Sequence, residues 1–218
     1  MIEIMASGFL FLFIIITNIA SGKFGYETVS DLDSKTKLRS IYNDPKKFKI
    51  SFSLILIEHF SIIFLALMLF LAFNQTNIVL ALIWTVFRTV EGLIQIYGKK
   101  NYWKLIRISE QFQNTEGNVK NSLIESGHKI LKKKNSIFTF AQILFSIGTL
   151  AYSIMFVTYV EVPMIIGWLG IVSSIIYYFG SVIVLLKPNS KILWGIGGLL
   201  ILIFELILGG WLLFSSII

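Results

Sequence analysis

Five ionisable side chains interrupt long apolar stretches of this 218-residue sequence, and they are its first candidates for chemistry. They are Glu58, His59, Arg88, Glu91 and Glu205. A charge at the centre of a bilayer costs about 2.5 to 3.5 kcal/mol on insertion scales, so such residues normally face protein or water. Because three acids accompany one arginine, the set indicates either a proton or cation site or a structural ion pair between helices.

The spacing of these residues predicts which of them meet. Glu91 follows Arg88 by three positions, which puts both on one helical face. On an antiparallel hairpin around the turn NQTN at 74–77, Glu58 lies about 26 Å and Glu91 about 23 Å from the turn, hence at a similar depth. Facing acids cannot both stay charged unless Arg88 or a bound cation lies between them. We expect Arg88 to be buried and paired with Glu91, Glu58 or Glu205, as a central polar cluster.

Further polar residues could extend this cluster. Four of them fall on one helical face: Gln142, Ser146, Thr149 and Ser153. They either line a polar seam toward the centre, together with His59, or only hydrogen-bond a neighbouring helix. The second histidine, His128, lies in a polar link, and a zinc hydrolase needs three protein ligands. We therefore expect no metal and no cofactor, and the sequence assigns no catalytic residue.

The composition defines the class of protein. Hydrophobic residues make up 56% of the chain and charged residues 14%, with a mean hydropathy of +0.79. This is typical of an integral membrane protein. No cysteine is present, which excludes disulfides, thiolate metal sites and a cysteine nucleophile. The net charge of +7 comes from residues flanking apolar runs, so the expected partners are the bilayer and anionic headgroups at the cytoplasmic face, and not nucleic acid.

The hydropathy pattern predicts an all-α polytopic bundle that forms one domain over residues 1–218. Six spans are expected, at about 4–20, 50–73, 78–97, 136–160, 164–186 and 192–213. Short links at 74–77 and 161–163 predict antiparallel hairpins. Asp44 and Pro45 predict a capped start for the second spanning helix. In the last span, five glycines predict close helix packing at both ends: Gly195, Gly197, Gly198, Gly209 and Gly210.

The polar links predict amphipathic helices on the cytoplasmic face. One is expected over 29–42, with start residues at Ser30 and Asp31. A second, over 99–112, either lies in the membrane interface or packs on the bundle. After a break at 114–117, a third runs over 119–134 and ends in the lysine run 132–134. We expect Lys132, Lys133 and Lys134 to rest on anionic headgroups, or to act only as a topology signal.

The basic residues also predict orientation. Lysine and arginine number seven in 21–49, nine in 98–135 and two in 187–191, whereas the two short turns and the ends of the chain carry none. Under the positive-inside rule, the three basic links lie in the cytoplasm and both termini lie outside. The expected location is the cell membrane, as a multi-pass protein.

Several stretches resemble one family. ASGFLFLFIIITNIA, VFRTVEGLI, GTLAYS, VPMIIGWLGIVSS and FELILGGWLL follow the order and spacing of the prokaryotic six-helix membrane family catalogued as domain of unknown function number 4386. The resemblance implies the fold and the span count, and no activity. It also implies that six residues occupy recurrent family positions: Arg88, Glu91, Pro163, Trp168, Glu205 and Trp211. The chain departs from the family at Glu161, because family members often place basic residues in that turn.

Three classes of function fit these observations. The first is a transporter or permease that uses the central acids for proton or cation coupling. The second is an intramembrane, lipid-handling enzyme that uses them as acid and base. The third is a non-catalytic sensor or accessory subunit, in which the charges only hold helices together. Sensitivity of thermal stability to ions and pH, to lipids, or to neither would separate the three.

Overall fold

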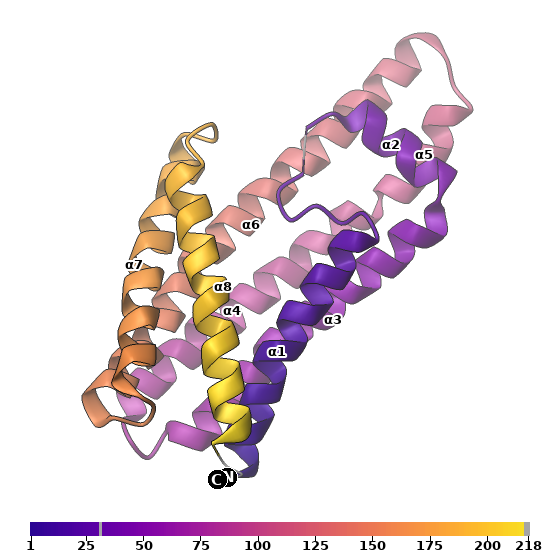
Figure 1. Cartoon of the computed structure of the whole chain (residues 1–218). Helices are drawn as coiled ribbons and strands as arrows, with labels where there is room; N and C mark the ends of the chain where they lie inside the picture. The colour runs from indigo at the N-terminus through magenta and orange to yellow at the C-terminus, as the bar shows by residue number, and fades with distance from the viewer. Residues whose placement is uncertain (31, 216–218) are drawn as a thin grey trace.

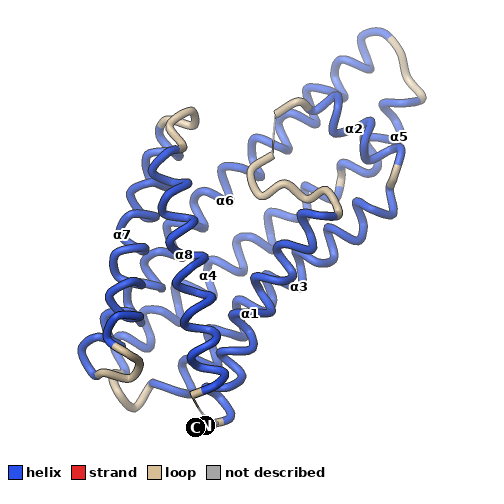
Figure 2. Tube along the Cα trace, in the orientation of Figure 1, coloured by secondary structure: helices blue, strands red, loops and turns tan. Residues whose placement is uncertain are grey.

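The computed structural model describes residues 1–30 and 32–215, which contain helices and loops and no strand (Figures 1 and 2). The helices are α1 (Ile2–Lys23), α2 (Ser34–Asn43), α3 (Pro45–Phe73), α4 (Ile78–Trp103), α5 (Leu105–Gln113), α6 (Gly117–Tyr159), α7 (Met164–Leu186) and α8 (Ile192–Phe214). Six helical segments are long and apolar enough to cross a membrane, and they belong to α1, α3, α4, α6, α7 and α8. The predicted all-α polytopic bundle of six spans is confirmed.

The six spanning helices form a closed ring. In order around the ring, α1 packs on α3, α3 on α4, α4 on α6, α6 on α7, α7 on α8, and α8 returns to α1. Figure 1 shows the start of α1 and the end of α8 side by side at one end of the bundle, which we call the terminal end. The three links that carry lysine and arginine lie at the opposite end, which we call the basic end.

Large apolar side chains fill the ring toward its terminal end. The largest of them are Phe11, Trp84, Tyr152, Phe156 and Phe204, all fully buried. They come from α1, α4, α6 and α8, so opposite walls of the ring contribute to one core. Their rings contact each other, with Tyr152 stacked on Phe204 at 6.0 Å between centroids and edge-on to Trp84 at 6.3 Å. Such aromatic contacts add to the stabilisation from buried apolar area.

At the basic end, α2, α5 and the first half of α6 pack into a second core. Its centre contains Leu38, Tyr102, Leu105, Phe112 and Leu131, each almost completely buried. Residues 99–112 therefore pack on the bundle, which was one of the two alternatives for this amphipathic segment. They do not form the one separate helix that was predicted, because Lys104 divides them between the end of α4 and α5. Helix α4 ends at Trp103, six residues beyond the end predicted at residue 97. It continues because Tyr102, in its last turn, packs into this second core.

Two predictions at the basic end are wrong. The segments 119–134 and 136–160 are not separate pieces, since α6 is one helix of 43 residues. Neither glycine nor proline lies near residue 135 to interrupt it, and the Asn135 side chain bonds to Ser30 instead of to its own helix. The first amphipathic helix does not begin at Ser30. It begins at Ser34, and the carboxylate of Asp33 caps it by accepting a bond from the Thr36 amide. Asp31 lies outside the described residues.

The predicted turns and caps are otherwise confirmed. Asp44 caps α3 by accepting from the Lys47 amide at 2.9 Å, with Pro45 at the first helical position. The link 74–77 joins α3 directly to α4, and 161–163 joins α6 to α7 after Val160, which has a positive φ of 56°. Two hairpins thus bring sequence neighbours together in the ring.

Glycines fix how closely α8 packs. A Cβ on Gly197 would lie 2.7 Å from the Tyr177 Cα, and a Cβ on Gly209 would lie 2.8 Å from the Phe11 Cβ. Both distances are too short for real carbon atoms, so these glycines allow α8 to contact α7 near one end and α1 near the other. The predicted packing at both ends is confirmed, although Gly195 and Gly210 face open space.

Candidate functional site

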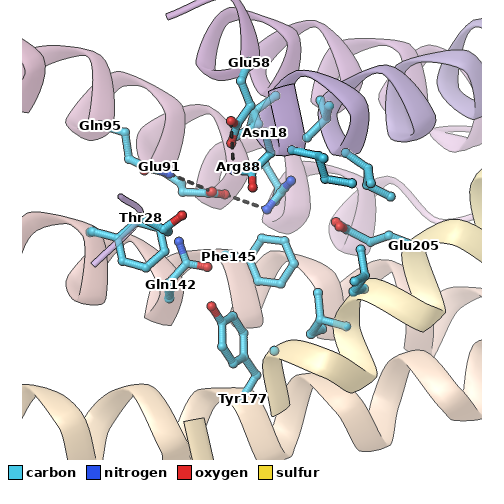
Figure 3. Close-up of a pocket in the computed structure, with 18 residues that line it drawn as sticks. Asn18, Thr28, Glu58, Arg88, Glu91, Gln95, Gln142, Phe145, Tyr177 and Glu205 are labelled. Atoms are coloured by element: carbon cyan, nitrogen blue, oxygen red, sulfur yellow. Dashed lines mark hydrogen bonds and ion pairs between the residues drawn. The ribbon is translucent and has the colours of Figure 1, made fainter. Parts of the chain in front are cut away.

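A cavity of about 260 Å³ lies inside the ring, on the basic-end side of the aromatic core (Figure 3). All six spanning helices contribute side chains to its wall. The polar members of the wall, labelled in Figure 3, are Asn18, Thr28, Glu58, Arg88, Glu91, Gln95, Gln142, Tyr177 and Glu205. The four charged residues of the predicted central cluster therefore meet at one cavity.

Arg88 is buried and paired, as its position predicts. One guanidinium nitrogen, Nη1, donates to Oε2 of Glu91 at 2.7 Å, and the two side chains are only 5% and 2% exposed. The other Glu91 oxygen accepts from Nε2 of Gln95 at 3.2 Å. The guanidinium also lies 4.3 Å from the centre of the Phe145 ring, within range for a cation–π interaction. The positive charge of Arg88 is thus already engaged by one carboxylate and one aromatic face.

The other two acids have weaker partners. Glu58 on α3 accepts a hydrogen bond from Nδ2 of Asn18 on α1 at 3.0 Å, and within the described residues it forms no ion pair. Glu205 on α8 is only 9% exposed, and within residues 1–30 and 32–215 it makes no hydrogen bond or ion pair. In Figure 3 its carboxylate points into the cavity on the side of Arg88. When all four groups are ionised, the cavity therefore carries more negative than positive charge.

The link between α1 and α2 covers the cavity toward the basic end. Thr28 of this link lines the cavity wall. The ammonium of Lys134, on α6, donates to the Glu27 carbonyl, to the Thr28 carbonyl at 3.1 Å and to the Ser30 hydroxyl at 2.7 Å. Asn135 adds two bonds to the Ser30 backbone, at 2.9 and 2.8 Å. The link is thereby attached to a helix that lies more than a hundred residues away in the chain.

A second buried lysine holds the start of this link. Nζ of Lys99 donates to the Tyr26 hydroxyl at 2.6 Å, and both side chains are buried. The ammonium of Lys134 also lies 4.8 Å from the centre of the Tyr26 ring. The prediction that Lys134 rests on headgroups is therefore wrong, because this side chain points into the bundle. Lys132 and Lys133 are exposed, and their contact with headgroups stays a prediction.

The predicted polar seam is not continuous. Only Gln142 of its members lines the cavity. Ser146 donates to the Gln142 carbonyl at 2.8 Å and borders a groove between α6 and α7, while Thr149 and Ser153 are completely buried between helices. His59 is also buried, outside the cavity wall, and its two ring nitrogens have no hydrogen-bond partner within the described residues. Small hydroxyl side chains are common where membrane helices pack together, and this explains the positions of Ser146, Thr149 and Ser153.

Several residues of the site were missed in the sequence. Gln95 and Lys99 follow Glu91 at intervals of four, so helical spacing could have found them. Asn18 stands alone in the apolar run IITNIA, which is a weaker signal. Tyr177 and Thr28 carry no sequence signal, because only the folded chain brings them to the cavity. Over residues 1–30 and 32–215, no three histidine, aspartate or glutamate side chains come close enough together to hold a metal ion.

Fold and site together define an integral, multi-pass helical membrane protein with a charged internal cavity. The chain belongs to the family described as Domain of unknown function (DUF4386), whose model matches residues 6–215. Comparison with curated proteins and comparison with solved structures each give no match. Of the residues that the resemblance pointed to, Arg88, Glu91 and Glu205 lie at the cavity, whereas Trp168 and Trp211 lie on the outer surface of the bundle.

Proposed function

We propose that this protein is a transporter or permease that binds a proton or a cation at its central carboxylates and couples that binding to transport. The observation that carries the proposal is Glu205. This carboxylate is nine-tenths buried, points into the cavity and makes no hydrogen bond or ion pair within the described chain. A buried carboxylate that makes neither a hydrogen bond nor an ion pair has a large desolvation cost, which a proton or a cation removes.

The charge balance supports a bound cation over a purely structural cluster. A structural ion pair needs Arg88 and one acid, and the bond from Arg88 to Glu91 already satisfies that need. Glu58 and Glu205 add two further acids to the same cavity, and the hydrogen-bond partner of Glu58 is the neutral Asn18 amide. Ionisable residues inside membrane spans commonly mark ion or proton pathways.

The position of the cavity supports transport. The aromatic core around Trp84, Tyr152 and Phe204 lies on its terminal-end side, and Thr28 of the α1–α2 link lines it toward the basic end. Alternating access requires a central site that is exposed to one side of the membrane at a time. We further propose that the protein lies in the cell membrane with both termini outside, because all basic links gather at one end of the bundle.

The test measures the thermal unfolding midpoint of protein in neutral-lipid nanodiscs. NaCl, KCl and choline chloride are compared at equal ionic strength over a pH series. We expect a midpoint that depends on the cation or on pH, because a ligand that binds only the folded state stabilises it. Glu205→Gln should abolish that dependence, whereas Glu110→Gln, at an exposed position on α5, should retain it.

The other two classes predict different results. A lipid-handling protein should respond to added lipid and not to ions, and a structural cluster should respond to neither. An ion and pH response that is absent in the parent protein, or equal in the parent and in Glu205→Gln, would reject the proposed coupling site.

A further inference from the structure

Two residues on the lipid-facing surface also line the central cavity. Ile19 on α1 is 55% exposed, and Leu202 on α8 is 38% exposed. Both belong to the cavity wall together with Asn18, Glu58 and Glu205. A side chain can border an internal cavity and the outer surface together only where the wall is one residue thick. The cavity therefore approaches the lipid through the seam between α1 and α8.

This seam is tight at one end only. Near the termini, a Cβ on Gly8 would lie 2.4 Å from the Leu213 amide nitrogen and 2.7 Å from the Gly209 carbonyl oxygen, so the two backbones are in contact. Toward the basic end, a Cβ on Gly22 of α1 or on Gly195 of α8 would have no neighbouring atom within 4 Å. Figure 1 shows α8 next to α1 at the termini and separating from it toward the basic end. The seam can thus widen in one half of the membrane.

The wall of the cavity combines apolar side chains with carboxylates. On α1 and α8, the helices that form the seam, the wall has five apolar side chains and two polar ones. The apolar ones are Ile14, Ile15, Ile19, Ile201 and Leu202, and the polar ones are Asn18 and Glu205. Glu58 of α3 and Glu91 of α4 add two more carboxylates to the same cavity. A molecule crossing this wall from the lipid would place an apolar part at the seam and a polar part among the carboxylates.

From this arrangement we infer that the cavity binds an amphipathic organic cation, an amine carrying an apolar chain, which enters from the bilayer between α1 and α8. The inference rests on the proposed cation site and names its ligand class. The ammonium group would lie against Glu205 and Glu58, neither of which forms an ion pair within the described residues. An anionic head would not be matched, because Arg88 is engaged by Glu91 and by the Phe145 ring.

The size of the cavity limits how much of the ligand it holds. Pockets that enclose a whole drug-sized ligand measure about 300 to 1,000 Å³. The volume here is about 260 Å³. The cavity would therefore take the head group and the first part of the chain, while the rest of the chain stays between α1 and α8 and in the lipid. The ligand would thus be divided between the cavity, which holds its head group, and the seam, which holds one apolar chain.

The experiment uses dodecylamine as the probe, with dodecanol and butylamine as matched molecules that lack the charge or the long chain. Binding is followed by the shift of the thermal unfolding midpoint in neutral-lipid nanodiscs. We expect dodecylamine to stabilise the parent protein more than either control molecule does. Leu202→Trp, which fills the seam, and Glu205→Gln, which removes the anion, should each weaken apparent binding about tenfold or more. Leu199→Trp is the matched control, since Leu199 is 59% exposed on the same helix and does not line the cavity.

A second measurement uses the absence of cysteine from the chain. In Leu202→Cys, dodecylamine should slow labelling of the single thiol by a lipid-soluble maleimide, and in Leu199→Cys it should not. This readout needs no bulky side chain and so does not depend on the folding of Leu202→Trp.

The outcomes separate the inference from the proposed function. Equal effects of dodecylamine and dodecanol, or equal protection of the two thiols, would overturn the amphipathic ligand. If sodium or pH still shifts the midpoint of the parent and not of Glu205→Gln, the cation site stands and only its ligand class is wrong. If the ion response is also missing, both proposals fail.

Discussion

Replacing Arg88 by leucine measures what the central ion pair contributes to stability. In the folded protein the guanidinium contacts Glu91 at 2.7 Å, and both side chains are almost completely buried. The change leaves the Glu91 carboxylate with a single neutral donor, Gln95, and removes the guanidinium from the cavity that also holds Glu58 and Glu205. The free energy of unfolding should therefore fall.

The size of the effect follows from the burial of the pair. Breaking a buried pair by removing one partner costs about 3 to 5 kcal/mol, because the remaining charge is uncompensated. The contact of the guanidinium with the Phe145 ring adds about 0.5 to 2 kcal/mol, part of which leucine regains by apolar packing. The Gln95 bond to Glu91 remains and reduces the loss. We expect a loss of about 3 kcal/mol, the lower end of the range for a broken buried pair.

The assay is equilibrium unfolding in mixed micelles, followed by tryptophan fluorescence. Arg107→Leu is the control, because Arg107 is exposed on α5. The double change Arg88→Leu with Glu91→Gln should recover much of the loss, and Arg88→Leu with Glu205→Gln should recover less, since Arg88 bonds to Glu91. A single mutant as stable as the parent protein, or no recovery in the first double mutant, would refute the reasoning.

Three further predictions concern the rest of the fold. Gly8→Val should prevent tight packing of α1 on α8 and strongly reduce the yield of folded protein by size exclusion, whereas Gly22→Ala, at an open position, should not. Lys134→Met should release the α1–α2 link, so that amide exchange over 26–30 becomes faster, whereas Lys133→Met should leave it unchanged because Lys133 is exposed. A reporter that is active only in the cytoplasm, fused after Ile218, should be silent, and strong activity would reverse the proposed orientation.

Local chemistry made part of the site predictable. Arg88 and Glu91 meet because a spacing of three puts them on one helical face, and that relation holds whatever surrounds the helix. Burial of the pair was also predictable, since an arginine within an apolar span needs an anion and protein around it. Gln95 lies four residues after Glu91 on the same helical face, so the same reasoning could have predicted it as part of the cluster. Glu205 was a candidate by its position, but the sequence could not show that it makes no hydrogen bond or ion pair within the described chain.

The sequence by itself determined the class of protein, the six spans and the hairpins. Apolar runs of membrane length and links of three or four residues leave few other arrangements, because every backbone polar group must be satisfied within the membrane. Caps such as Asp44 with Pro45 were equally local, so their prediction did not depend on the remainder of the fold.

Only the tertiary structure decided which faces of the helices meet. Three consecutive lysines look alike in sequence, yet Lys134 binds the α1–α2 link while its two neighbours stay exposed. Gln142 reaches the cavity whereas Ser153, on the same face of α6, is buried against α7 at Gly170. The physical reason is that closure of the ring sets the rotation of each helix about its axis. That rotation depends on packing between segments far apart in the chain, which no local pattern encodes.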